Sequence, residues 1–179
     1  MLQTKLKINP GAVVMLALIC YCDNAGVFSV TLPAITVHEL GHYAALHIFG
    51  CRLRSVTVGA FGLEMDYLGA LTDRQLRACA AAGPASGLIY AALILLSRSR
   101  YCQMSGTVSL LLSAFNLLPI LPLDGGRVLE TLIGKTKAKT VSKAAALLML
   151  AAAAVLTGIF GSWTLLVMAV WLIICNFRA

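Results

Sequence analysis

Long uncharged stretches alternate with short charged stretches along this chain. An α-helix needs roughly 20 apolar residues to cross the hydrocarbon core of a bilayer, and most of the uncharged stretches approach that length. Residues 144–177 form a run of 34 uncharged residues, too long for one crossing, with a glycine-rich middle that indicates a turn. We therefore expect an all-α polytopic membrane protein with about six transmembrane helices, five being the alternative. The predicted spans are residues 8–22, 25–49, 78–97, 106–123, 144–160 and 162–177, in a single domain of residues 1–179.

Residues 55–67 interrupt this helical pattern just after the second span. They begin with β-branched residues and two glycines, and then Leu63, Met65 and Tyr67 alternate with two acidic residues. Alternation with period two is typical of a β-strand with one buried face. The segment therefore predicts a short β-hairpin or re-entrant segment, with an ordinary cytoplasmic loop as the alternative.

The composition supports the membrane class. Hydrophobic residues make up 60% of the chain and charged residues only 12%, with a mean hydropathy of +0.89. Average soluble chains carry about 25% charged residues, so these values exclude both an ordinary soluble domain and a disordered chain.

The positive charges indicate an orientation. With the N-terminus in the cytoplasm, only Arg98 and Arg100 fall on the outer side. The other twelve lysines and arginines fall inside: Lys5, Lys7, Arg52, Arg54, Arg74, Arg77, Arg127, Lys135, Lys137, Lys139, Lys143 and Arg178. This bias follows the positive-inside rule and explains most of the net charge of +7 without a nucleic-acid partner. We expect a multi-pass protein of the cell membrane. The first run lacks a small-residue cleavage site, so we do not interpret it as a signal peptide.

All three histidines of the chain lie within ten residues of the second span. His38 and His42 are four residues apart, so a helix projects both from one face, where they can bind a single metal ion. Glu39 lies beside that position and is a candidate general base for a hydrolytic reaction. His47 lies about 140° further round the helix and is not expected to be a ligand. The alternative is a buried polar pair that only hydrogen-bonds between helices.

A catalytic zinc site needs three protein ligands and one open position. Among the apolar stretches, the remaining acidic residue is Asp124, at the end of the fourth span. The second and fourth spans both run from outside to inside, so Asp124 and the two histidines belong to the cytoplasmic half of the membrane. We therefore predict one Zn²⁺ per chain, bound by His38, His42 and Asp124, in a site that opens toward the cytoplasm.

The two motifs together resemble a known family. His-Glu-Leu-Gly-His at residues 38–42, followed by Asn-Leu-Leu-Pro-Ile-Leu-Pro-Leu-Asp-Gly-Gly at residues 116–126, looks like the site-2 protease family of intramembrane zinc metalloproteases. The compact chain is most similar to the sporulation-factor-processing branch of that family. The resemblance implies the same three zinc ligands, Glu39 as catalytic base, and Asn116 as a residue that binds substrate or stabilises the oxyanion.

The predicted function is hydrolysis of peptide bonds in or near the transmembrane segments of a membrane-anchored protein substrate. The lipid bilayer is the expected medium, and a regulatory membrane protein is a further expected partner. A helical substrate hides its carbonyl groups in hydrogen bonds, so we expect residues 55–67 to hold an unwound substrate as an added strand. The alternative is a non-proteolytic metal-binding membrane protein or transporter. Transporters often contain repeated halves, and the histidine cluster is not repeated in the second half of the chain.

Overall fold

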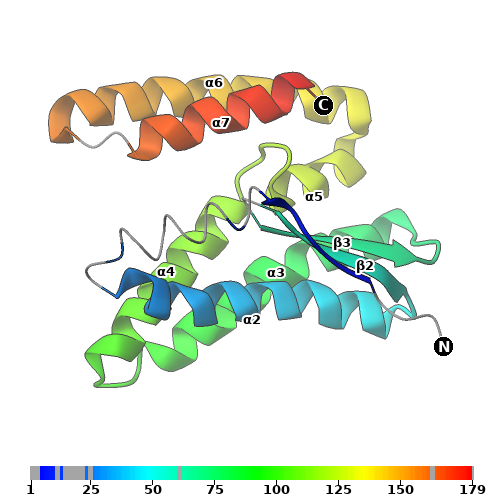
Figure 1. The fold of residues 1–179 in the computed structure, drawn as a ribbon. Helices are drawn as coiled ribbons and strands as arrows, with labels where there is room; N and C mark the ends of the chain where they lie inside the picture. The colour runs from blue at the N-terminus through cyan, green and yellow to red at the C-terminus, as the bar shows by residue number, and fades with distance from the viewer. Residues whose placement is uncertain are drawn as a thin grey trace.

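The computed structural model describes residues 5–10, 13, 23, 26–59, 62–161 and 164–178 (Figure 1). Apart from Ile8, Asn9, Pro10 and Val13, the predicted first span at residues 8–22 lies outside the described residues. The elements in chain order are β1 (Lys5–Ile8), α2 (Val27–Ile48), β2 (Arg52–Gly59), β3 (Gly62–Leu68), α3 (Asp73–Ile94), α4 (Arg100–Asn116), α5 (Asp124–Ile133), α6 (Lys135–Phe160) and α7 (Thr164–Arg178).

Helix α2 is bounded by clear local signals. The Asp23 carboxylate accepts hydrogen bonds from the backbone N–H groups of Val27 and Phe28, at 2.6 and 2.8 Å. These bonds satisfy donors of the first turn that have no partner within the helix. The helix ends before Gly50, whose φ of 75° turns the chain toward β2. The acidic residue that interrupts the apolar pattern in the sequence therefore marks the start of this helix.

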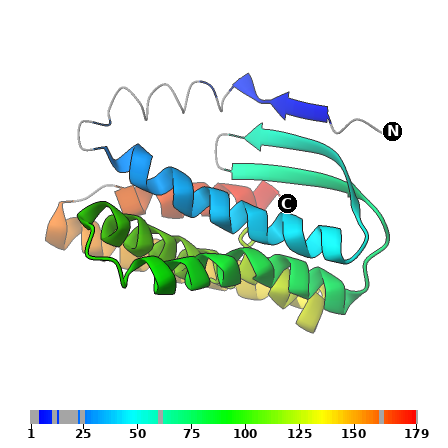
Figure 2. The same ribbon diagram turned by 90° about the horizontal axis from the view of Figure 1, so that it is seen from below.

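The predicted hairpin is confirmed, and it belongs to a larger sheet. Strands β2 and β3 pair antiparallel, and β1 pairs parallel with β2, giving the strand order β1-β2-β3. Lys5 lies opposite Ser55 and Ile8 opposite Val58. The all-α prediction is therefore wrong to this extent: the chain is mostly helical but contains a three-stranded sheet. Figure 2 shows the three strands running alongside α2.

The helices form two groups. Helices α2, α3 and α4 pack against one another, and α6 and α7 lie side by side as a second group (Figure 1). Helix α6 ends at Phe160 and is followed by Gly161, whose φ of 67° favours glycine, so the 34-residue run forms two helices that divide near the predicted position. That each of the two helices crosses the membrane stays a prediction. Helix α5 contacts both α3 and α6 and joins the two groups.

The predicted fourth span at residues 106–123 is wrong in its boundaries. Helix α4 runs from Arg100 to Asn116, and the chain then forms a loop that ends at Leu123. Pro119 and Pro122 lie in this loop, where each removes a backbone N–H that a continuing helix would need. Asp124 is consequently the first residue of α5 rather than the last residue of a long span.

Two helices of the described part of the chain, α3 and α6, are both long enough and apolar enough to cross a membrane. Helices α4 and α7 have 17 and 15 residues and are short for a crossing, whereas α2 has 22 residues but contains all three histidines and Glu39. Each of these five helices carries large apolar side chains that are at least half exposed, among them Leu32, Leu40, Ile89, Leu93, Leu111, Leu148, Ile159 and Val167. Soluble proteins rarely expose apolar surface of this extent.

Candidate metal centre

Three side chains predicted from the sequence as metal ligands converge at one point. His38 and His42 come from α2, and Asp124 comes from the start of α5. The Asp124 Oδ2 atom lies 3.2 Å from His38 Nε2 and 3.3 Å from His42 Nε2. The two Nε2 atoms lie 3.2 Å from each other. The three ligand atoms therefore form a nearly equilateral triangle.

The size of this triangle fits zinc. Zinc binds imidazole nitrogen and carboxylate oxygen at roughly 2.0–2.2 Å in tetrahedral geometry, which places neighbouring ligand atoms about 3.3 Å apart. The three observed separations agree with that value. Hydrogen bonds alone satisfy the arrangement less well, since two ring nitrogens that face each other can share only one proton along their line. We conclude that two nitrogens and one carboxylate oxygen form a donor set suited to zinc.

The His42 ring is held by α3. Its Nδ1 atom lies 2.8 Å from the backbone carbonyl oxygen of Cys79, to which Nδ1–H donates, and this bond leaves Nε2 for the metal. His38 is more deeply buried than His42, and its Nδ1 atom has no hydrogen-bond partner among the described residues. The polar contacts of the His38 ring are therefore made by Nε2, which faces Asp124 and His42.

Asp124 is positioned by the loop that precedes it. Ile120 and Leu123 are buried in a cluster with Ala146 of α6 and Leu172 of α7. The Leu121 backbone N–H donates to Ser142 Oγ of α6 at 2.7 Å. The loop is thus packed against the α6–α7 pair, and α5 begins at a fixed point beside the histidines.

Asp124 is buried. It belongs to α5, which is not one of the two membrane-length helices. Burial alone would raise its pKa, but the two histidine rings within 3.3 Å of Oδ2 outweigh burial and hold the pKa of this carboxyl at about 2. Asp124 is therefore ionised at neutral pH, the form in which a carboxylate binds a cation.

Glu39 follows His38 directly on α2 and is half-buried. The backbone amide of Leu63, at the start of β3, lies close to the Glu39 carboxylate. The glutamate therefore lies between the metal centre and the sheet. A carboxylate at this position can accept a proton from a water molecule that attacks a carbonyl group near the metal.

The other sequence-predicted residues are not part of this cluster. Asn116 is the last residue of α4, and its Nδ2 donates to the carbonyl of Leu112 at 2.9 Å. Its role toward substrate stays a prediction. His47 is exposed near the end of α2 and contacts Tyr43 rather than the three ligands. The contribution of Cys79 was not predicted, because it acts through a backbone carbonyl that any residue could supply.

Gly83 of α3 explains how the two helices approach so closely at the metal centre. A Cβ atom at this position would overlap the imidazole ring of His42. The ring cannot move away without losing its hydrogen bond to Cys79. Gly83→Ala is therefore expected to lower zinc affinity about 10- to 100-fold, as disruption of groups that orient a ligand commonly does. Competition for zinc against a coloured chelator measures this loss.

Gly158→Ala is the matched control. Gly158 lies in α6, and an added Cβ would meet no atom within 4 Å. We expect this variant to keep the zinc affinity of the wild type. Equal zinc retention by the two variants would show that close packing at Gly83 is not required for the site.

Comparison with known proteins agrees with this geometry. Residues 65–159 match the family model described as peptidase family M50. The matched range contains Asp124 and follows the His38–His42 motif in the chain. Zinc metalloprotease MJ0392 of Methanocaldococcus jannaschii is 30% identical over 144 residues, which cover 70% of this chain and 42% of that protein. Rip3 of Mycobacterium tuberculosis is 32% identical over 139 residues, covering 70% of this chain and 35% of that protein. The chain thus spans less than half the length of these relatives.

One solved structure has the same fold. The site-2 protease from Methanocaldococcus jannaschii superposes with a TM-score of 0.69, covering 97% of this chain and 89% of that chain at 20% sequence identity. The likeness in fold therefore extends over nearly the whole chain.

Proposed function

The chain belongs to peptidase family M50, and from that membership we propose that it is an intramembrane zinc metalloprotease. The proposed substrate is a membrane-anchored protein, cut in or near its transmembrane segment. The observation that carries this proposal is the triangle of His38, His42 and Asp124 with Glu39 beside it.

The chain's own groups provide the proposed chemistry. Zinc, when bound, would polarise the scissile carbonyl and make the attacking water more acidic. Glu39 would accept the proton of that water and later deliver it to the amine that leaves. His42 is kept in one tautomer by Cys79, and Asp124 supplies negative charge. These contacts hold His42 and Asp124 in place before substrate binds.

The exposed apolar surface of the helices supports residence in a bilayer. Six crossings with the N-terminus in the cytoplasm remain part of the proposal. The strong bias of lysines and arginines to one side supports this orientation. The direct pairing of β1 with β2 supports an even number of crossings between them, because paired strands lie on the same side of the membrane.

Strand β3 is the proposed docking site for unwound substrate. It lies at one edge of the sheet, and its first residues approach Glu39. An edge strand presents unpaired N–H and C=O groups on its outer side, which can pair with an extended peptide. A substrate bound in this way would expose its peptide bonds beside the metal centre.

Proline substitutions in β3 test this docking. Proline removes one N–H, and successive residues of a strand direct theirs alternately toward β2 and toward the open edge. Of Glu64→Pro and Met65→Pro, the variant that loses an outward N–H is expected to keep its zinc and to cleave at least about tenfold more slowly. Cleavage rate and zinc content are measured on the same sample. Unchanged cleavage by both zinc-loaded variants would contradict substrate addition to β3.

The function is tested with purified protein reconstituted in vesicles with a membrane-anchored peptide library. We expect mass spectrometry to find products cut within or next to the apolar segment. A zinc chelator should abolish these products, and added zinc should restore them. Passage of zinc into the vesicles without any cleavage would instead show a transporter.

A further inference from the structure

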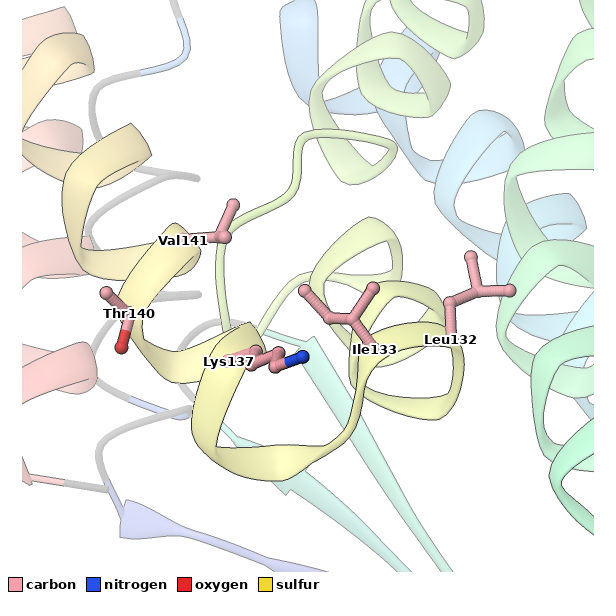
Figure 3. Close-up of a pocket in the computed structure, with 5 residues that line it drawn as sticks. All are labelled: Leu132, Ile133, Lys137, Thr140 and Val141. Carbon is pink, nitrogen blue, oxygen red and sulfur yellow. The ribbon is translucent and has the colours of Figure 1, made fainter.

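The corner between α5 and α6 forms a shallow hollow away from the metal centre. It has a volume of about 650 Å³ and is lined by Leu132, Ile133, Lys137, Thr140 and Val141 (Figure 3). Leu132, Ile133 and Val141 are 56%, 38% and 41% exposed. The hollow therefore combines an uncovered apolar floor with an ammonium group at its edge.

Positive charge is concentrated around this hollow. The first nine residues of α6 contain Lys135, Lys137, Lys139 and Lys143, and its first turn has no acidic residue. Glu130 of α5 forms a long ion pair with Lys135, at 3.9 Å. No carboxylate of the described residues lies within ion-pair distance of Lys137. The site is therefore complementary to an anion that carries an apolar tail.

The position of the hollow along α6 points to the kind of anion. Helix α6 is one of the two membrane-length helices, and its uncharged part begins directly after Lys143. When the uncharged part lies in the hydrocarbon core, the lysine-rich turns lie at the level of the lipid headgroups. The apolar floor of the hollow then lies within reach of the acyl chains.

We propose that the α5–α6 corner is a binding site for one anionic phospholipid. The phosphate pairs with Lys137, and an acyl chain covers Leu132, Ile133 and Val141. This proposal rests on the membrane embedding proposed above but not on proteolysis.

Contacts on the other face of α6 connect this site to the metal centre. Ala138 and Ser142 of α6 are fully buried, and Ser142 Oγ accepts the hydrogen bond from Leu121 in the loop before Asp124. Helix α5 has only ten residues, with Asp124 at one end and Ile133 at the other. A lipid that bridges α5 and α6 at this corner therefore restrains the helix that carries a zinc ligand.

The test uses full-length protein in nanodiscs of phosphatidylcholine with increasing phosphatidylglycerol. Native mass spectrometry counts the phosphatidylglycerol retained per chain, and a chelator measures the rate of zinc loss. Lys137→Gln is the test variant. Arg98→Gln is the matched control, because Arg98 is an exposed cation between α3 and α4 and does not line the hollow. Equal zinc content of both variants in pure phosphatidylcholine shows that they are folded.

We expect the wild type and Arg98→Gln to retain one phosphatidylglycerol and to lose zinc more slowly when it is present. Lys137→Gln should bind it about fivefold more weakly and lose this protection of zinc. Equal weakening by both variants would overturn the site in favour of diffuse attraction. Displacement of the lipid by soluble glycerol phosphate would overturn it in favour of a free-phosphate site. Lipid retention is measured without cleavage, so failure of the site and failure of the proposed protease activity are separate results.

Discussion

Glu39→Gln is expected to bind one zinc per chain, as the wild type does, and to cleave substrate at least about 10³-fold more slowly. The substitution keeps the size of the side chain but removes the group that accepts the proton of the attacking water. General base catalysis commonly contributes a factor of about 10² to 10⁴. His38, His42 and Asp124 are unchanged, so the metal should stay in place. Zinc content by atomic emission and cleavage by gel-based product analysis are measured on one preparation.

Glu130→Gln is the control for this variant. Glu130 lies on α5, and its long ion pair with the exposed Lys135 contributes little to stability. We expect its zinc content and cleavage rate to equal those of the wild type. If Glu39→Gln cleaved substrate at the rate of the wild type, another group would have to be the base.

Asp124→Ala is expected to lose zinc and, with it, all detectable cleavage. Disturbing only the groups that orient a ligand costs 10- to 100-fold in affinity, so removal of a ligand itself should cost more than about 100-fold. The change also leaves His38 and His42 without the carboxylate to which both now lie close. Zinc retained after chelator treatment measures the loss.

Asp73→Ala is the matched control for Asp124→Ala, because it also removes one carboxylate. Asp73 begins α3, where it contributes to the first turn and has no contact with the three ligands. We expect this variant to keep zinc and activity, with only a small loss of stability. Full zinc retention by Asp124→Ala would exclude Asp124 from the ligand set.

The sequence was informative about the metal centre because the required chemistry is visible in residue types. The spacing of His38 and His42 follows from one turn of helix, and Glu39 and Asp124 are conspicuous because carboxylates are rare in apolar stretches. That the start of α5 would lie beside α2 could be expected from the predicted orientation of the spans and from the resemblance to the site-2 protease family. In the structure the His38, His42 and Asp124 side chains lie together, and their role as zinc ligands stays a prediction.

Features that depend on backbone and tertiary contacts could not be predicted in this way. Strand β1 has only four residues, and its pairing with β2 bridges about fifty residues of chain. Cys79 acts through its carbonyl oxygen, which has no signature in the sequence. The contact between Gly83 and His42 depends on how α2 and α3 pack together.

Zinc is expected to lie between His38, His42 and Asp124. X-ray absorption at the zinc edge of the purified, zinc-loaded protein measures its ligands. We predict one zinc per chain with only nitrogen and oxygen ligands at about 2.0–2.2 Å, two of them imidazoles. The buried thiols of Cys51 and Cys79 offer the other known kind of zinc ligand near this part of the fold. Sulfur ligands at about 2.3 Å, or a single imidazole, would exclude this ligand set.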